Sequence, residues 1–122
     1  MAELIRNMIE LIKNPKEVAK GGEPEFEKYW TPMRIDLDVL YEAVDLNEEL
    51  EKPIKSAKDE KGRIDKMLAF VADKVYGGQF TKEHLRKGLH SPTAIQTLQE
   101  QILFVARGMQ SEATKKYLEK NR

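Results

Sequence analysis

The sequence predicts an all-α protein: a small bundle of about four to five helices with an extended or partly strand-like N-terminal arm. Apolar residues recur at spacings of three and four through residues 64–75 and again through residues 95–106, as on one face of a helix. Helix-starting and helix-ending residues separate these runs. We predict an arm over residues 1–34, a helical core domain over residues 35–108, and a charged C-terminal helix or tail over residues 109–122.

The arm begins with an apolar run that fits two structures. Residues 4–12 carry apolar side chains at helical spacing, yet NMIELI is also apolar enough for a short strand. An Asn-Pro pair ends this run, and glycines and prolines follow, so we expect residues 13–33 to be extended and mobile. Three aromatic residues lie there: Phe26, Tyr29 and Trp30. Because burying aromatic rings is favourable, we expect them to dock on this domain or on a partner.

The first helix of the core is predicted to begin at Asp36, whose carboxylate can serve as the N-cap. Pro53 should end it just after Lys52. The expected buried stripe of this helix is Leu37, Leu40, Tyr41 and Val44. The charged residues 54–63 are typical either of a linker or of a solvated first turn of the next helix.

A corner between two helices is the most strongly signalled feature of the chain. A helix over about residues 63–76 should end at a glycine pair, because glycine adopts positive φ without strain. A threonine hydroxyl can then cap a short helix over residues 82–87. Large apolar residues flank this cap as in a hydrophobic staple, and a further glycine ends the short helix. The corner residues are Gly77, Gly78, Phe80, Thr81, Leu85 and Gly88.

The next helix should begin at Ser91 as N-cap, with a proline at its first position. Its expected core face is Ile95, Leu98, Ile102, Val105 and Ala106. Leu103 and Phe104 fall outside that face, so the helix is either central in the bundle or covered by another molecule. Gly108 should end it. A last charged helix, capped by Ser111, is expected to fray.

Composition excludes several classes of protein. The chain has 122 residues and no cysteine, which excludes disulfides and thiolate sites. It lacks a signal peptide and a stretch of about 20 apolar residues, so we expect no membrane contact and a cytoplasmic protein. The formal net charge is zero, yet residues 36–51 contain seven acidic residues and no basic one. Such separated charge belongs either to solvated faces or to a surface that aligns like molecules head to tail or binds a charged partner.

Catalytic signals are weak, and we predict neither an enzyme nor a cofactor or metal site. His84 and His90 are six residues apart, which is not a helical zinc spacing. No nucleophile elbow, phosphate loop or dinucleotide motif is present. The alternative function is a small helical DNA-binding regulator, because the helix-starting and helix-ending residues of the 81–107 segment are spaced as in a helix-turn-helix. The second helix of that unit offers no basic residue before Arg107, which argues against nucleic acid as a partner.

A family resemblance rests on the residues of the corner and its flanks. The matching residues are Asp65-Lys66-Met67, Phe70-Val71, Tyr76-Gly77-Gly78-Gln79-Phe80-Thr81 and Gly88-Leu89. Residues 28–44, KYWTPMRIDLDVLYEAV, and the later Leu98-Gln99 and Ile102 extend the similarity to roughly residues 28–108. The pattern resembles the tail assembly chaperones of bacteriophages with long non-contractile tails, especially those infecting Gram-positive bacteria, in their short, non-frameshifted form.

The resemblance implies a helical chaperone made in the cytoplasm of the infected host and absent from the mature virion. It implies that the protein binds the tape measure protein, and that a longer, frameshifted form recruits the tail tube protein. A chaperone for a long helical client needs apolar contacts rather than a catalytic pocket. We therefore expect a surface for the client or for self-association, made of Phe26, Tyr29, Trp30, Leu103 and Phe104.

Overall fold

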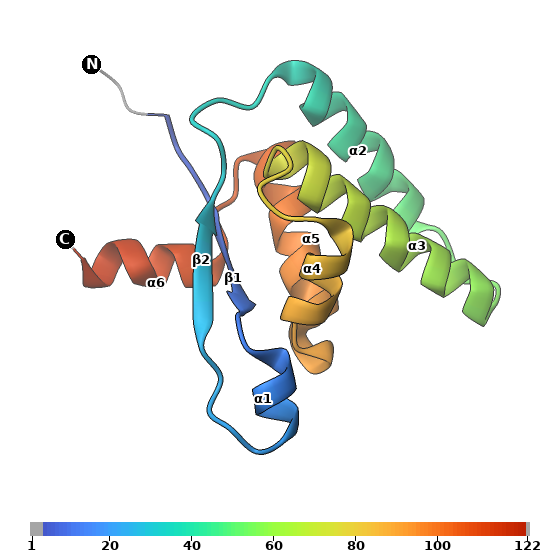
Figure 1. Ribbon diagram of the computed structural model, residues 1–122. Coiled ribbons are helices and arrows are strands. Elements are labelled where there is room, and N and C mark those ends of the chain that lie inside the picture. Colours follow the sequence, from blue (N-terminus) through green and yellow to red (C-terminus); the bar gives the residue numbers. More distant parts are fainter. Residues whose placement is uncertain (1–3, 122) are drawn as a thin grey trace.

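The computed structural model describes residues 4–121; residues 1–3 and 122, which belong to the predicted arm and tail, lie outside the described part. The elements are β1 (Met8–Ile12), α1 (Pro15–Ala19), β2 (Phe26–Trp30), α2 (Leu37–Glu51), α3 (Ala57–Phe70), the π-helix η1 (Val71–Val75), α4 (Lys82–Gly88), α5 (Ser91–Arg107) and α6 (Glu112–Lys120). Helices dominate, as predicted, but the all-α class was incomplete, because β1 and β2 form a two-stranded sheet. Figure 1 shows this hairpin between α6 and the other helices of the bundle.

The N-terminal arm is a β-hairpin that belongs to the core. The strand alternative for the first apolar run is confirmed, and β1 pairs antiparallel with β2 from Met8↔Trp30 to Ile12↔Phe26. Ile9 and Leu11 are buried because β1 lies against helices as well as against β2. The expectation that residues 13–33 are extended is confirmed for β2 but was wrong for α1, which is helical. The division into arm, core and tail stays a prediction.

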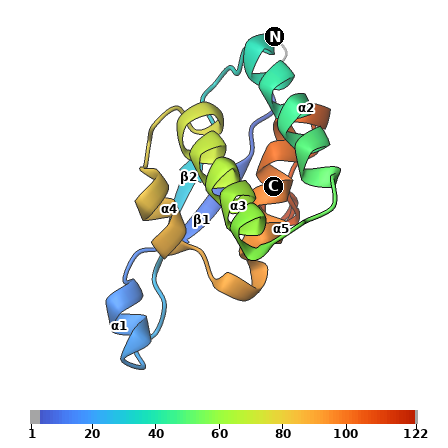
Figure 2. The same ribbon diagram turned by 90° about the vertical axis from the view of Figure 1, so that its right-hand side faces the viewer.

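The α2 helix begins as predicted but turns a different face inward. The Asp36 carboxylate accepts hydrogen bonds from the amides of Asp38 and Val39, which confirms the cap. Ala43 and Leu46 are the buried residues, whereas Leu37 and Tyr41 are each 63% exposed. The predicted stripe was therefore wrong at those two positions, because α2 packs on α5 through the side that carries Ala43 and Leu46. Figure 2 shows α2 and α3 lying over α5.

The charged stretch after Pro53 is helix rather than linker over most of its length. Ser56 accepts a hydrogen bond from the Asp59 amide, and α3 begins at once. The guanidinium of Arg63 donates to the backbone carbonyls of Lys52 and Pro53, so it closes the turn between α2 and α3. The solvated-first-turn alternative was therefore the better one for residues 57–63.

The corner is confirmed at Gly77, Gly78 and Thr81. The two glycines have φ of +62° and +81°, and the Thr81 hydroxyl accepts from the His84 amide at 3.0 Å. Phe80 and Leu85, the predicted staple pair, are both buried. A π-helical turn precedes the glycines, since the Tyr76 amide bonds to the carbonyl five residues earlier.

Gly88 has a different role from the one predicted. It is the last residue of α4, and its φ is not positive. The α4 helix passes so close to β1 that a Cβ on Gly88 would stand 2.9 Å from the Cβ of Leu11. Glycine is therefore required by contact between two backbones rather than by the end of a helix.

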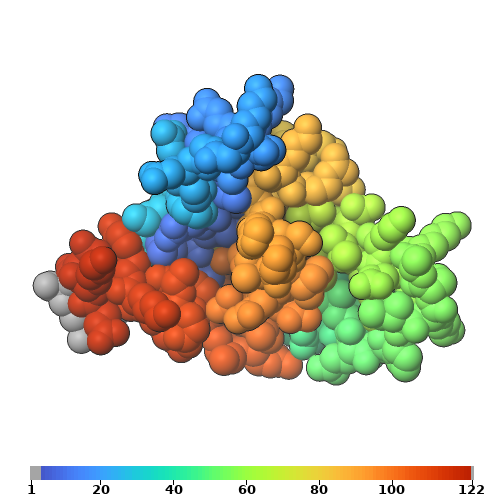
Figure 3. Space-filling view, turned by 90° about the horizontal axis from the view of Figure 1, so that it is seen from below, coloured from blue at the N-terminus to red at the C-terminus, as the bar shows by residue number. Residues whose placement is uncertain are grey.

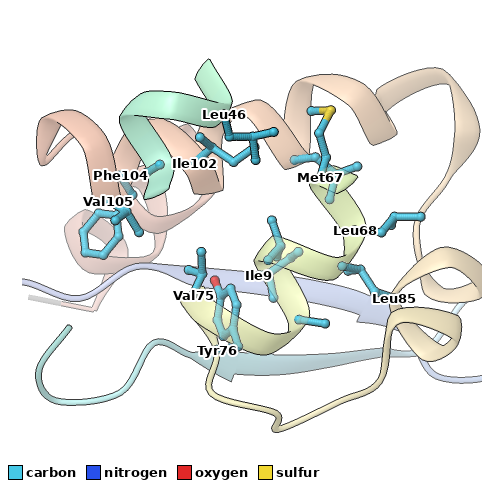
Figure 4. Close-up of a cluster of buried hydrophobic side chains, with 14 of the residues drawn as sticks. Ile9, Leu46, Met67, Leu68, Val75, Tyr76, Leu85, Ile102, Phe104 and Val105 are labelled. Carbon is cyan, nitrogen blue, oxygen red and sulfur yellow. The ribbon is translucent and has the colours of Figure 1, made fainter. Parts of the chain in front are cut away.

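The α5 helix is the central element of the bundle. It begins at Ser91 with His90 in the cap position and no side-chain cap bond, so the Ser91 cap was wrong, although Pro92 lies in the first turn as expected. Because α5 contacts α2, α3 and η1, its Phe104 is only 6% exposed. Ile95, expected in the core, is 40% exposed. Figure 4 shows Phe104 with the buried apolar side chains that surround α5.

A buried hydrogen-bond network joins β1 to the end of the chain. The Asn7 side chain donates to Gln101 Oε1 at 3.1 Å and accepts from the Ser111 amide and the Thr114 hydroxyl at 2.9 and 2.7 Å. The Tyr76 hydroxyl donates to the same Gln101 oxygen. Burial raises the pKa of Tyr76 far above its usual value, so that hydroxyl stays protonated. This network anchors α6, which was expected to fray; the Ser111 cap is confirmed.

Candidate functional site: an apolar groove at the start of α2

An apolar groove opens where the N-terminal segment, the loop before α2 and the C-terminal end of α5 meet. It encloses about 360 Å³. Nearly buried Phe104 and Val105 form its floor. The residues that line this apolar groove are Leu4, Ile5, Pro32, Met33, Arg34, Ile35, Asp36, Leu37, Leu40, Phe104 and Val105. Figure 1 shows the beginning of α2, whose residues Leu37 and Leu40 line the groove, at one end of the molecule.

Large apolar side chains stand exposed on the rim of the groove. Leu4, Ile5, Met33 and Leu37 are between 57% and 65% exposed, and Tyr41 follows Leu37 one helical turn later with 63% exposed. Single exposed apolar residues are ordinary, but several gathered around a hollow are typical of a binding surface.

Polar bonds to the backbone fix the walls of the groove. The Arg6 guanidinium donates to the Thr31 carbonyl at 2.8 Å, and the Gln110 amide donates to the Arg6 carbonyl at 2.8 Å. Asp36 caps the first turn of α2 from the other wall. The walls are thereby held by hydrogen bonds, while their apolar side chains remain open to solvent.

A second hollow lies on the other side of the segment that carries Leu4 and Ile5. Trp30 and Leu118 line it together with that segment. The Trp30 ring packs edge-on against Tyr117, with 5.6 Å between centroids, so it joins β2 to α6. Leu4 and Ile5 therefore separate two apolar hollows that share a wall.

The structure does not bring the five sequence-predicted surface residues together. Tyr29 packs edge-on against Phe80 with 4.9 Å between ring centroids, so it belongs to the core of the hairpin. Phe26 is 54% exposed at the far end of β2, and Leu103 is half-buried. The assumption that Phe104 is exposed was wrong, although Phe104 does reach the groove from below.

Sequence reasoning missed the residues on the rim. Leu37 and Tyr41 were assigned to the core because their spacing matches a buried helical stripe. Met33 was overlooked because it stands in a loop. One signal could have found them: α2 has more apolar residues than one contact face on a single neighbour can cover.

Ion pairs with α3 and η1 neutralise only part of the acidic α2 helix. Lys66 pairs with Glu49, and Lys74 lies 3.9 Å from Glu42. The hydrogen bond from Lys66 holds the pKa of Glu49 below its usual value. No other acidic residue of α2 forms an ion pair within residues 4–121. The remaining carboxylates keep a negative face on α2.

Other chemistry has little support in the described part of the chain. Across residues 4–121 no group of three or more His, Cys, Asp or Glu side chains is arranged to hold a metal ion. No helix within that range is long and apolar enough to cross a membrane. His84 packs edge-on against Tyr29 and Phe80. The helix that a DNA-binding regulator would insert into DNA is α5, and its central position in the bundle argues against that alternative.

The chain is similar to a known protein family over nearly its whole length. A family model described as phage tail chaperone protein matches residues 3–122. No curated protein matches the chain, and no solved structure does. The match covers the hairpin, the bundle and α6, so it includes every element that builds the groove.

Proposed function

The chain belongs to the phage tail chaperone family, and on that premise we propose that it binds the tape measure protein and keeps it soluble during tail assembly. In this proposal it also helps to recruit tail tube subunits, through a longer, frameshifted form that carries the tube-binding part. It acts in the cytoplasm of the infected bacterium and is absent from the mature virion. Membership in a family of chaperones points to a protein that works by binding rather than by catalysis.

The apolar groove is the observation that carries this proposal. A tape measure protein is long and helical, and an amphipathic helix is bound by laying its apolar stripe into a groove. The rim supplies unpaired apolar side chains, and the floor supplies the buried ring of Phe104. Covering these side chains would remove apolar area from water on both partners, which is favourable.

The test is co-expression of the chain with the tape measure protein of the same phage, with the soluble fraction of the client as readout. Leu37→Glu and Tyr41→Glu place charges on the rim without entering the core. Each should weaken the complex at least about tenfold, because one buried apolar side chain contributes that much. The client should then move to the insoluble fraction. Phe104→Glu is a poorer test, since Phe104 is buried and a charge there would disrupt the core.

Ile54→Glu is the matched control. Ile54 is 56% exposed, like the rim residues, but it lies in the loop between α2 and α3, away from the groove. Client solubility should be unchanged in this variant. If the client were equally soluble with the Leu37, Tyr41 and Ile54 variants, the groove would not be the surface that binds it. An insoluble client with the unaltered chain would remove the proposed function itself.

A further inference from the structure

The exposed face of α2 continues the apolar groove and changes its chemistry along the helix. Leu37, Tyr41 and Glu48 are exposed and lie at helical spacings of four and seven, so they share one face. Asp38 and Asp45 are exposed beside them. This face therefore begins as an apolar surface at the groove and becomes acidic toward the end of α2.

The acidic side chains of this face form no ion pair among residues 4–121, although Lys52 and Lys55 line a hollow together with Asp45 and Glu48. Of the seven acidic residues in residues 36–51, two pair with lysines of α3 and η1, and five have no ion-pair partner among residues 4–121. The lysine-rich α6 helix gives no compensation, because Figures 1 and 3 show it at the opposite end of the molecule from α2. Among the residues lining the groove, Arg34 alone is basic, and it stands beside Asp36.

We propose that the apolar groove and the exposed face of α2 together bind a basic amphipathic helix. Its apolar stripe enters the groove and covers Leu37 and Tyr41, and its lysines or arginines face Asp38, Asp45 and Glu48. The inference rests on the proposed function, since it specifies the kind of client segment that the chaperone selects. From Leu37 to Glu48 the face extends about 16 Å, so it matches a partner helix of about three turns.

Charge complementarity is what favours this occupant. A helix flanked by glutamates would meet the same apolar surface but would place like charges opposite α2, which is unfavourable. A flat β-strand would leave the groove unfilled, because its side chains alternate between two faces. The carboxylates of α2 and the basic side chains of the partner helix would attract one another mainly as solvated groups. This attraction should therefore weaken as ionic strength rises.

Two synthetic helical peptides test this inference by fluorescence anisotropy. Both carry the same leucine stripe at spacings of three and four; one is flanked by lysines and the other by glutamates. At low salt the lysine peptide should bind about tenfold more tightly, because three exposed charge pairs give a preference of that order. At about 1 M salt the preference should largely disappear.

A charge-reversed variant tests whether the acidic residues of α2 cause the preference for the lysine peptide. The triple variant Asp38→Lys, Asp45→Lys, Glu48→Lys should favour the glutamate peptide instead. The control Glu23→Lys, Asp73→Lys, Glu119→Lys makes the same change in net charge at exposed positions outside the groove and α2. This control variant should still bind the lysine peptide more tightly than the glutamate peptide. Circular dichroism should show that both variants retain the helical content of the unaltered chain.

The outcomes separate this inference from the function on which it rests. An insoluble tape measure protein in the presence of the unaltered chain contradicts the function. Equal binding of the two peptides, absent binding of both, or an unchanged preference in the α2 variant overturns the inference, even when the client stays soluble. A reversal that appears equally in the control variant would show an effect of net charge alone and would also overturn it.

Discussion

Replacing Asn7 with alanine is expected to lower the free energy of unfolding by about 3 kcal/mol. The Asn7 side chain bonds to Gln101, Ser111 and Thr114, all of which are buried. Alanine would leave the Ser111 amide and the Thr114 hydroxyl without that acceptor. A buried polar group that loses its partner costs about 1–3 kcal/mol, and at least two groups lose theirs here.

Urea unfolding followed by circular dichroism measures this loss. Asn47→Ala is a suitable control, because Asn47 lies on α2 and forms no hydrogen bond through its side chain in the described structure. Its free energy of unfolding should change by less than about 0.5 kcal/mol. If both variants lost a similar amount of free energy of unfolding, the hydrogen bonds of Asn7 would stabilise the fold no more than an asparagine without such bonds.

Replacing Gly88 with alanine is expected to lower the free energy of unfolding by about 2 kcal/mol, because it overpacks the contact between α4 and β1. The new Cβ would lie 2.9 Å from the Cβ of Leu11, an atom attached directly to the backbone of β1. A flexible side chain can rotate away from such a contact, but a Cβ cannot. The helix or the strand must therefore move.

The same substitution at Gly62 should have the opposite effect on the free energy of unfolding. Gly62 lies inside α3, and a Cβ there meets nothing within 4 Å. Alanine should raise the free energy of unfolding by about 0.5–1 kcal/mol through its better helix propensity. Thermal unfolding of both variants measures the contrast. A stable Gly88→Ala protein would show that α4 and β1 can separate at little cost.

Much of the fold could be predicted because its signals are local. Asp36, Thr81 and Ser111 cap their helices as their sequence positions indicate, and the glycine pair ends the α3–η1 helix. A cap depends on residues within one turn, so sequence alone reveals it. The hairpin was harder, because β1 is stabilised by residues about one hundred positions away, such as Thr114.

The candidate site was harder to predict because it depends on which way α2 is turned. Leu37 and Tyr41 have the spacing of a buried stripe, and only the packing of Ala43 and Leu46 on α5 shows that they are exposed. Phe104 posed the converse problem, since the central position of α5 buries a residue outside its strongest apolar face. Periodicity identifies an apolar face but does not say what covers it.

The Asn7 network also fixes the order in which the molecule can be completed. Asn7 leaves the ribosome well before Ser111 and Thr114, which follow 104 and 107 positions later. At about 5–20 residues per second, the first strand waits on the order of 5–20 s for those partners. During that time β1 can pair with β2, but its apolar side chains lack the contacts with α4 and α6 that help to bury them. A chain that ends before residue 111 would therefore leave its N-terminal strand, rather than its C-terminal end, as the segment most prone to aggregate.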